Sequence, residues 1–435
     1  MTVSGWVGQQ ISFWDDGVES NSYVHDLGST LGSHVKFTGS AQISSGWSAG
    51  YVLHIEAISN DSLTMNADTP VGPGALAGGG NVQTLQSYWF VKSDHLGKVG
   101  VGKQSQASDN TAILVDGSGS LVPANWVAFD VNSFAVRGTG ALNLLSPTRG
   151  TGFLNNGEIT GFAGKTWGSI GSCYGGGAWG DCNGATQNVV RYDSPTFGGF
   201  SVSASWGEDD MWDVAARYAG EHHGFKFAAA AAYNEITGGG VNNTYAGGQG
   251  NIVPQPDVEY FQVGAYLQHV ATGLFVYGAY GNNQLDVAWG DIDGNVYGDG
   301  RTADLENVNG DVEADNFYIK AGLRSKWNHL GATVFYGEYL NNQADTRGSG
   351  SFADLGNGPD GGTLGTVSQS DDLEVWGLGI VQEVDAAAMS VWVKYRHLSL
   401  DTATSIDAVD GGNLLNVQGN TEDFQYVGVG GLINF

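Results

Sequence analysis

Basic residues are scarce in this chain of 435 residues, which carries 17 Lys and Arg against 45 Asp and Glu and a net charge of −28. Nucleic-acid binding depends on clustered Lys and Arg that neutralise phosphates. The charge balance therefore argues against a DNA or RNA partner. Charged residues of both signs make up only 14% of the chain, whereas about a quarter is typical of soluble domains.

Long hydrophobic runs are also missing. The longest uninterrupted apolar stretch is Phe227–Tyr233, far short of the roughly 20 residues that a helix needs to cross a bilayer. The sequence therefore predicts no transmembrane helix. Proline is rare, with 8 residues, while glycine reaches 70. Because the glycines occur inside alternating segments as well as between them, the composition is not that of collagen or of a flexible linker.

Alternation of polar and apolar residues is what the sequence does contain, and it is clearest in the last stretch, Glu422–Phe435. Val427, Val429 and the terminal Phe435 fall on one face, while Tyr426 falls on the other. A period of two residues indicates a β-strand. A chain that ends on an aromatic residue of such a strand resembles a bacterial outer-membrane β-barrel, in which the last strand pairs with the first.

Sixteen segments of this kind follow one another, and the connections between them alternate between short and long. This alternation is typical of a transmembrane barrel with tight periplasmic turns and long outer loops. We therefore predict a 16-stranded antiparallel transmembrane β-barrel, formed as a single domain by residues 1–435. The predicted strands span residues 3–14, 33–44, 49–58, 83–93, 98–106, 188–194, 200–206, 211–219, 225–236, 258–270, 274–284, 316–327, 332–342, 373–384, 389–400 and 422–435.

The few basic residues lie mainly on the polar faces of these segments. Burying unpaired charge is costly, so we expect these side chains to point into a water-filled interior while the apolar faces meet lipid. In residues 316–327, Phe317 and Ile319 should face lipid, and Tyr318 and Lys320 should face the lumen. Sixteen strands enclose a barrel wide enough for an aqueous channel. The expected interior cations are Lys36, Arg191, Arg217, Lys320, Arg324, Lys394 and Arg396.

Residues 107–186 interrupt the rhythm of strands and turns. Loops longer than about 15 residues are uncommon unless they are functional. This segment contains apolar patches at residues 112–115, 126–129 and 142–145, which fit packing against the inner wall of the barrel or against a neighbouring subunit. We predict that it is a long third loop folded into the lumen, where it narrows the channel.

Specific motifs accompany this layout: RYDSPTFGGFSVSASW at residues 191–206, WGDC at 179–182, GKVGVGKQ at 97–104 and the terminal Phe435. Together they resemble the Gram-negative general porins of the alphaproteobacterial type. The resemblance implies a homotrimer in the bacterial outer membrane, with a third loop as the constriction of each barrel. The third loop is much longer here than in the family pattern. We expect a mature chain whose export signal has been removed, with Met1 as an expression start.

The resemblance also implies a set of pore residues, because in general porins acids on the third loop face bases on the wall. Facing rows of opposite charge create a transverse field across a narrow neck. For each residue, an ordinary salt bridge elsewhere in the lumen remains an alternative. The acids would be Asp109, Asp116, Asp130, Glu158 and Asp181, and the bases Lys36, Arg191, Arg217, Lys394 and Arg396.

Cys173 and Cys182 are the only cysteines and lie within the third loop. In an exported protein they predict a disulfide, and two thiolates with no histidine nearby in the sequence are too few for a zinc site. Asp291 and Asp293 faintly resemble a calcium loop. The glycine and glutamate of an EF-hand are absent there, which leaves a looser structural Ca²⁺ site in the acidic loops open. No other cofactor is expected.

We therefore predict a passive diffusion channel for small hydrophilic solutes and ions, in contact with the lipid bilayer and lipopolysaccharide. The net charge favours cations. Residues 46–50, GWSAG, match the G-x-S-x-G pattern of hydrolases, but they fall on a hairpin turn and not on a strand-to-helix elbow, so no enzyme is predicted. The alternatives are a substrate-selective porin with a sugar or anion track, a surface adhesin or receptor barrel, and an outer-membrane hydrolase.

Overall fold

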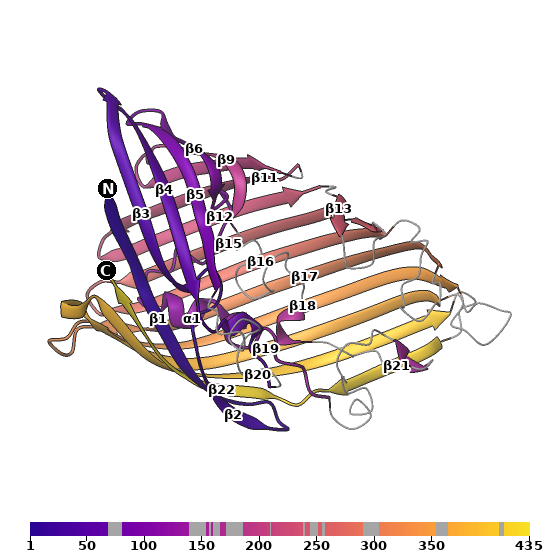
Figure 1. Cartoon of the computed structure of the whole chain (residues 1–435). Coiled ribbons are helices and arrows are strands. Elements are labelled where there is room, and N and C mark those ends of the chain that lie inside the picture. The colour runs from indigo at the N-terminus through magenta and orange to yellow at the C-terminus, as the bar shows by residue number, and fades with distance from the viewer. Residues whose placement is uncertain are drawn as a thin grey trace.

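One antiparallel sheet of eighteen strands dominates the chain and closes on itself where β1 pairs with β22 (Figure 1). The computed structural model describes residues 1–67, 81–138, 154–155, 158–159, 166–170, 186–208, 210–237, 240–243, 251–254, 257–289, 304–353, 364–408 and 413–435. Sixteen of the strands form the barrel wall. They are β1 (Thr2–Asp15), β3 (Ser33–Ser44), β4 (Trp47–Ile58), β5 (Asn81–Ser93), β6 (Gly97–Gln104), β9 (Gln187–Asp193), β10 (Phe200–Gly207), β11 (Trp212–His222), β12 (Phe225–Ile236), β15 (Asp257–His269), β16 (Leu274–Trp289), β17 (Asp304–Ser325), β18 (Thr333–Ala353), β19 (Leu364–Val384), β20 (Met389–Ala408) and β22 (Phe424–Asn434).

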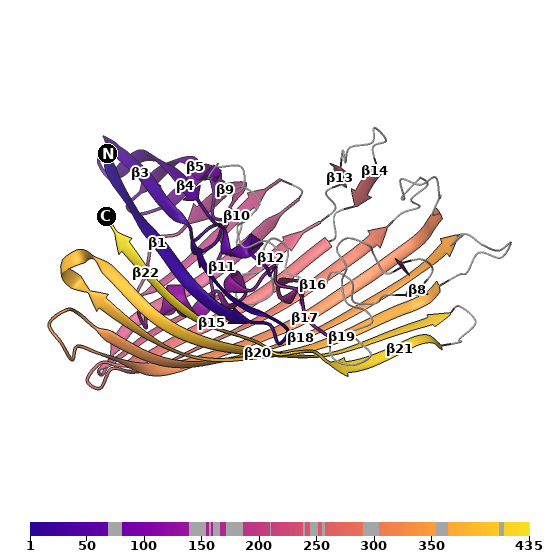
Figure 2. The same cartoon turned by 60° about the horizontal axis from the view of Figure 1, so that its bottom comes forward.

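The other two strands of the sheet extend the wall without adding to its circumference. Strand β2 (Ser20–His25) pairs with the same edge of β1 as β3 does, and β21 (Asn413–Asn420) shares an edge of β20 with β22. The predicted sixteen-stranded antiparallel barrel is thus confirmed. Both termini lie at the end of the barrel that carries the short turns, and the β13–β14 hairpin lies at the opposite end (Figure 2).

Short elements lie in the connections. Among the described residues, no helix is long and apolar enough to cross a bilayer. Besides the sheet, these residues form two small hairpins, one α-helical turn and several 3-10 turns. They are β7 (Leu154–Asn155) with β8 (Glu158–Ile159), β13 (Gly240–Asn243) with β14 (Asn251–Pro254), α1 (Leu121–Asn125), η1 (Ser62–Thr64), η2 (Val127–Asp130), η4 (Trp167–Ser169) and η5 (Asp385–Ala387).

Several predicted loops are instead continuations of strands. Strand β17 has 22 residues, which at about 3.3 Å per residue gives about 70 Å, more than twice the roughly 30 Å hydrocarbon core of a bilayer. The predicted loop at 401–421 is largely β20 and β21, which pair from Asp401 onward. Beyond a bilayer neither face of a strand needs to be apolar. Pairing therefore continues there without the alternation that reveals a strand in the sequence.

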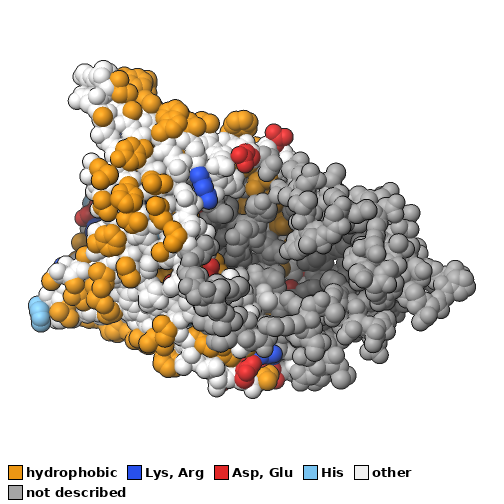
Figure 3. Space-filling model, viewed as in Figure 1, with side chains coloured by type: hydrophobic (Ala, Val, Ile, Leu, Met, Phe, Trp, Pro, Cys, Tyr) orange, Lys and Arg blue, Asp and Glu red, His pale blue; other side chains and the backbone are white. Residues whose placement is uncertain are grey.

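The apolar side of the wall faces outward, as predicted for residues 316–327. Phe317 and Ile319 are 46% and 39% exposed, whereas Tyr318 and Lys320 are 6% and 0% exposed. Hydrophobic side chains cover the outer surface near the end that carries the termini (Figure 3). On the side of the long loops, outward phenols adjoin acids: the hydroxyl of Tyr339 donates to Glu374 at 2.9 Å. The outward band of apolar side chains, called here the apolar belt, therefore ends at polar residues on that side.

The interior of the barrel contains a hydrophobic core. It is built from residues of the connections at 26–32, 59–67, 113–138 and 167–170 together with inward side chains of β1, β2, β15 to β20 and β22. Phe134 lies at its centre, with ring centroids 5.0 Å from both Trp14 and Phe424. Met65 and Val131 are fully buried beside it. Apolar burial of this kind holds the connections inside the wall.

Ile319→Lys tests which face of the wall meets lipid. A lysine near the middle of the outward apolar belt should lower the free energy of unfolding by about 2–4 kcal/mol, measured by urea unfolding in phospholipid vesicles. Gln284→Lys is the matched control, since Gln284 is exposed on the same outer side of β16 beyond the aromatic row, and it should change little. Equal costs for the two variants would show that Ile319 does not face the hydrocarbon.

Candidate functional site

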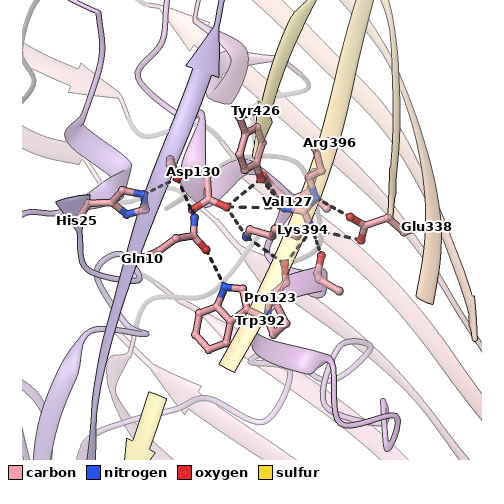
Figure 4. Close-up of polar contacts among 12 residues, drawn as sticks. Gln10, His25, Pro123, Val127, Asp130, Glu338, Trp392, Lys394, Arg396 and Tyr426 are labelled. Atoms are coloured by element: carbon pink, nitrogen blue, oxygen red, sulfur yellow. Dashed lines mark hydrogen bonds and ion pairs between the residues drawn. The ribbon is translucent and has the colours of Figure 1, made fainter. Parts of the chain in front are cut away.

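Charged side chains on the inner face of the wall converge on the connection that follows β6. Strands β18, β20 and β22 place Glu338, Lys394, Arg396 and Tyr426 on this face, and η2 ends at Asp130 opposite them (Figure 4). With Gln10 of β1, these six residues are called here the Asp130 cluster. All of them are buried, so their charges must be compensated within the protein.

Asp130 is the hub of the cluster. Its carboxylate accepts hydrogen bonds from the Lys394 ammonium at 2.6 Å, the Tyr426 hydroxyl at 2.9 Å and the Gln10 amide at 2.9 Å. A guanidinium nitrogen of Arg396 lies 3.9 Å away. Ionised acceptors form the stronger hydrogen bonds, and two donors of the hub come from the first and last strands of the barrel.

Arg396 joins the wall to the connection. Its Nε donates to Glu338 at 2.7 Å and one Nη donates to the Tyr426 hydroxyl at 3.0 Å, while the other Nη donates to the carbonyl oxygen of Ala124 in α1. The hydroxyl of Tyr318 donates to the second Glu338 oxygen at 2.6 Å. Guanidinium and carboxylate are therefore both satisfied despite their burial.

Glycines make these contacts possible. Gly377 of β19 lies between Glu338 and Arg396 in the register, and a Cβ there would stand 2.6 Å from a Glu338 oxygen and 3.1 Å from Arg396 Cγ. Gly428 of β22 leaves room in the same way, because a Cβ there would lie 3.0 Å from Gln10 and from Lys394. Without side chains at these positions, partners two strands apart can meet.

A second ion pair fixes the connection beside the cluster. The Lys320 ammonium lies 2.6 Å from the Asp116 carboxylate and donates to the Asn125 amide oxygen at 2.6 Å. The rings of Tyr277 and Tyr336 flank it at 5.5 and 5.6 Å, close enough for cation–π attraction. Asp116 and Asp130 thus contact their cations directly, without a water-filled gap.

The start of the connection, residues 107–112, is held by a separate part of the wall. Asp213 of β11 accepts from the backbone and the hydroxyl of Ser108, both at 2.6 Å. Arg217 donates to the Ala107 carbonyl oxygen at 2.5 Å and to the Thr111 hydroxyl at 2.8 Å. Gln262 of β15 accepts from the Ala112 backbone at 2.8 Å. Residues 107–130 are therefore anchored from β11 round to β22.

Arg191 and Lys36 lie apart from the Asp130 cluster, on β9 and β3. Arg191 lies 2.8 Å from Asp193 on its own strand and donates to the carbonyl oxygens of Ser105 and Gln106 at 2.9 and 3.0 Å. Lys36 lies on β3, directly opposite His54 of β4. The ring of His54 is 4.1 Å from that of His34, so this part of the wall carries a cation beside two imidazoles.

Two buried acids of the connection, both outside the membrane-spanning strands, have shifted pKa values. Burial alone would raise the pKa of Asp130, but Lys394, His25 and Arg396 outweigh it and lower the pKa to about 2. Burial raises the pKa of Asp109 to about 6, since Ser105, Arg191 and Arg217 compensate only in part. Asp109 therefore changes charge within the physiological range, and Asp130 remains ionised there.

The structure brings seven of the predicted pore residues to the connection, which they contact or belong to: Asp109, Asp116, Asp130, Arg191, Arg217, Lys394 and Arg396. Only the backbone of Glu158 is described. Five further predicted residues lie outside the described residues, namely Asp181, Cys173, Cys182, Asp291 and Asp293. Sequence reasoning missed Glu338 and Asp213, whose inward position on polar strand faces was the available signal.

Asp130→Asn tests the hub. Removing its charge leaves Lys394 and Arg396 in a buried site with one compensating carboxylate, Glu338, so the free energy of unfolding should fall by about 3–5 kcal/mol. Asp385→Asn is the matched control, because Asp385 forms an exposed ion pair with Lys326, and such pairs contribute about 1 kcal/mol or less. Urea unfolding at neutral pH compares the variants. A similar small loss for both would contradict the role of Asp130.

Asp109→Asn tests the raised pKa. Since the folded pKa of about 6 exceeds the usual 3.8, the native chain loses stability as pH rises from about 4 to above 6. Asparagine removes this dependence, so the variant should be more stable than the parent by roughly 1–3 kcal/mol at pH 8 and equal to it at pH 4. Urea unfolding at both pH values measures this. A variant that is less stable at pH 8 would contradict the shift.

Comparison with known proteins gives likeness at the level of the fold. No protein-family model matches the sequence, and no curated protein matches it. Among solved structures, the anion-selective porin from Comamonas acidovorans is 14% identical, with 100% of this chain and 99% of that chain covered and a TM-score of 0.50. A loop-deletion mutant of OmpT, an outer membrane protein of Vibrio cholerae, is 12% identical over 100% and 98% of the chains with a TM-score of 0.49. OmpF of Salmonella typhi is 13% identical over 100% and 97%, with a TM-score of 0.44. The chain thus shares the barrel fold of the first of these proteins.

Proposed function

We propose that this protein is an outer-membrane channel through which small hydrophilic solutes and ions diffuse passively. The observation that carries the proposal is the sidedness of the closed barrel: exposed apolar side chains form the outer face of the strands, and the buried charged side chains of the strands face inward, beside the hydrophobic core. A soluble barrel places its apolar side chains inside, whereas a channel in lipid reverses the order. The fold shared with a porin structure agrees with this reading.

The constriction is assigned to the connection that follows β6. Residues 107–130 are fixed to the inner wall by buried ion pairs, and the hydrophobic core beside them occupies part of the cross-section. A solute must pass between these residues and the uncovered wall. Asp109, Arg191, Arg217 and Lys36 are proposed to set the local field there, with a preference for cations because of the net charge of −28.

A substrate-selective porin is the second candidate. The interior core favours it, because Phe134, Met65 and their neighbours are packed against one side of the wall and leave less room than an empty barrel of sixteen strands would. In a narrower passage, each solute contacts the side chains of the barrel wall as it passes. Saturable transport of one class of solute, such as a sugar or an anion, would then replace free diffusion.

Further features belong to the proposal: the homotrimer follows the family resemblance, the disulfide follows from export, and the Ca²⁺ site follows from the acidic loop. The barrel assembles as a homotrimer and contacts lipopolysaccharide with its outer surface. Cys173 and Cys182 form a disulfide within the third loop. The acidic loop that contains Asp291 and Asp293 holds a structural Ca²⁺, which a carboxylate-rich loop suits. The protein carries solutes and catalyses no reaction.

Single-channel recording in a planar lipid bilayer tests the function. The purified protein should insert and give ohmic conductance steps in groups of three. Linear growth of the current with salt supports diffusion, whereas block by one solute at saturating concentration supports selectivity. The reversal potential in a KCl gradient reports cation preference. Absence of conductance from folded, membrane-inserted protein would refute the proposal and favour an adhesin, receptor or hydrolase.

A further inference from the structure

The outer surface of the barrel contains a groove of about 810 Å³ that crosses the strands from β16 to β22. Its lining is apolar. The residues that form it include Ala321, Leu323, Phe335, Gly337, Leu378 and Ile380. The groove lies on the face opposite to the Asp130 cluster, since outward and inward residues alternate along each of these strands. It therefore plays no part in the passage of solutes.

Two small residues create the depth of the groove. Ala321 of β17 and Gly337 of β18 are directly paired across the strands, and both belong to the outward face. The next outward pair on one side is Leu323 with Phe335, and on the other side Ile319 with Tyr339. Large pairs on both sides of a small pair leave a notch in the apolar belt.

The space at Gly337 is not required by the packing of the wall. A Cβ built there would lie 3.4 Å from a methyl carbon of Leu378, an ordinary van der Waals contact. The glycine also has no positive φ, so other residues could occupy the position without backbone strain. The groove is therefore a feature of the surface that a different side chain could fill.

We propose that the groove binds one acyl chain of a membrane phospholipid, with the headgroup at the end of the barrel that carries the short turns. The lining offers mainly hydrocarbon contacts at the level of the apolar belt, where lipid is the surrounding solvent. At the short-turn end, the exposed ring of Trp327 lies 5.2 Å from Phe335. Tryptophan occupies the interface between hydrocarbon and headgroups, which places the polar end of the lipid there.

Charge at this end fits a phosphate. Lys326 precedes Trp327 in the sequence. Its ammonium lies 2.9 Å from the carboxylate of Asp385, and both side chains are exposed. Exposed ion pairs of this kind are weak, so the ammonium remains able to attract a lipid phosphate. Hydrophobic contact in the groove and attraction at Lys326 would act on the two ends of the same lipid. The inference depends on the proposed membrane location but not on solute passage.

Native mass spectrometry of the detergent-solubilised full chain, with phosphatidylglycerol added, tests the proposal. The parent should retain one phospholipid per chain under activation that removes the others. Ala321→Leu and Gly337→Leu should each reduce the retained fraction about tenfold, the factor expected from losing contact with one or two methylene groups. Ala204→Leu, on β10 and away from the groove, is the matched control and should retain the lipid. Lys326→Ala should weaken retention without abolishing it.

Three outcomes would overturn the proposal. Retention that is equal in the parent and in both groove variants would place the lipid elsewhere. No retained lipid in the parent would show that the groove does not select one. Loss of oligomers in the groove variants, with no lipid in the parent, would identify the groove as a contact between copies of the chain. Single-channel conductance should be the same in parent and variants, so a failed lipid test leaves the channel function untouched.

Discussion

The pairing of buried charges inside the barrel is the constraint on which the rest of the structure depends. Asp130 meets Lys394 at 2.6 Å in a site that water hardly reaches. Removing two ions from water costs several kcal/mol each, and only direct contact with additional hydrogen bonds offsets that cost. Tyr426 and Gln10 donate those bonds to Asp130, and Arg396 donates in turn to the Tyr426 hydroxyl. The connection after β6 is therefore held in one position by electrostatics, and the apolar core packs around it.

Two regions of wall hold the same connection. Asp213, Arg217 and Gln262 fix its first residues, while Lys320 and the Asp130 cluster fix the later ones. Because the anchors lie on well-separated strands, movement of the connection would break several charge-assisted bonds together. The stretch between Ala107 and Asp130 is thus held in place at both of its ends. The titration of Asp109 within this stretch links its charge to the surrounding pH.

Alternation in the sequence was sufficient to predict the barrel. A strand with lipid on one side and charged groups on the other has an apolar residue at every second position. Phe317 and Lys320 illustrate this, since each lies on the predicted face. The extension of β17 left no such mark, because its outward residues Glu313 and Asp315 are acidic where a membrane strand would carry apolar side chains. The extension of β20 is mostly polar. The sequence also could not predict which charged residues pair with each other. That Asp116 meets Lys320 depends on the path of a connection across a distance of 204 residues in sequence. Glu338 reaches Arg396 only because Gly377 has no side chain between them.

The seam between β1 and β22 is where the two ends of the chain meet, and the Asp130 cluster includes residues from both sides of it. Gln10 lies on the first strand and Tyr426 on the last, and both donate to the same carboxylate. During biogenesis these donors acquire their acceptor only when the connection is already inside. Closing of the seam and placement of the connection inside the barrel are therefore coupled, because Asp130 has both of these hydrogen bonds only when the two are in place.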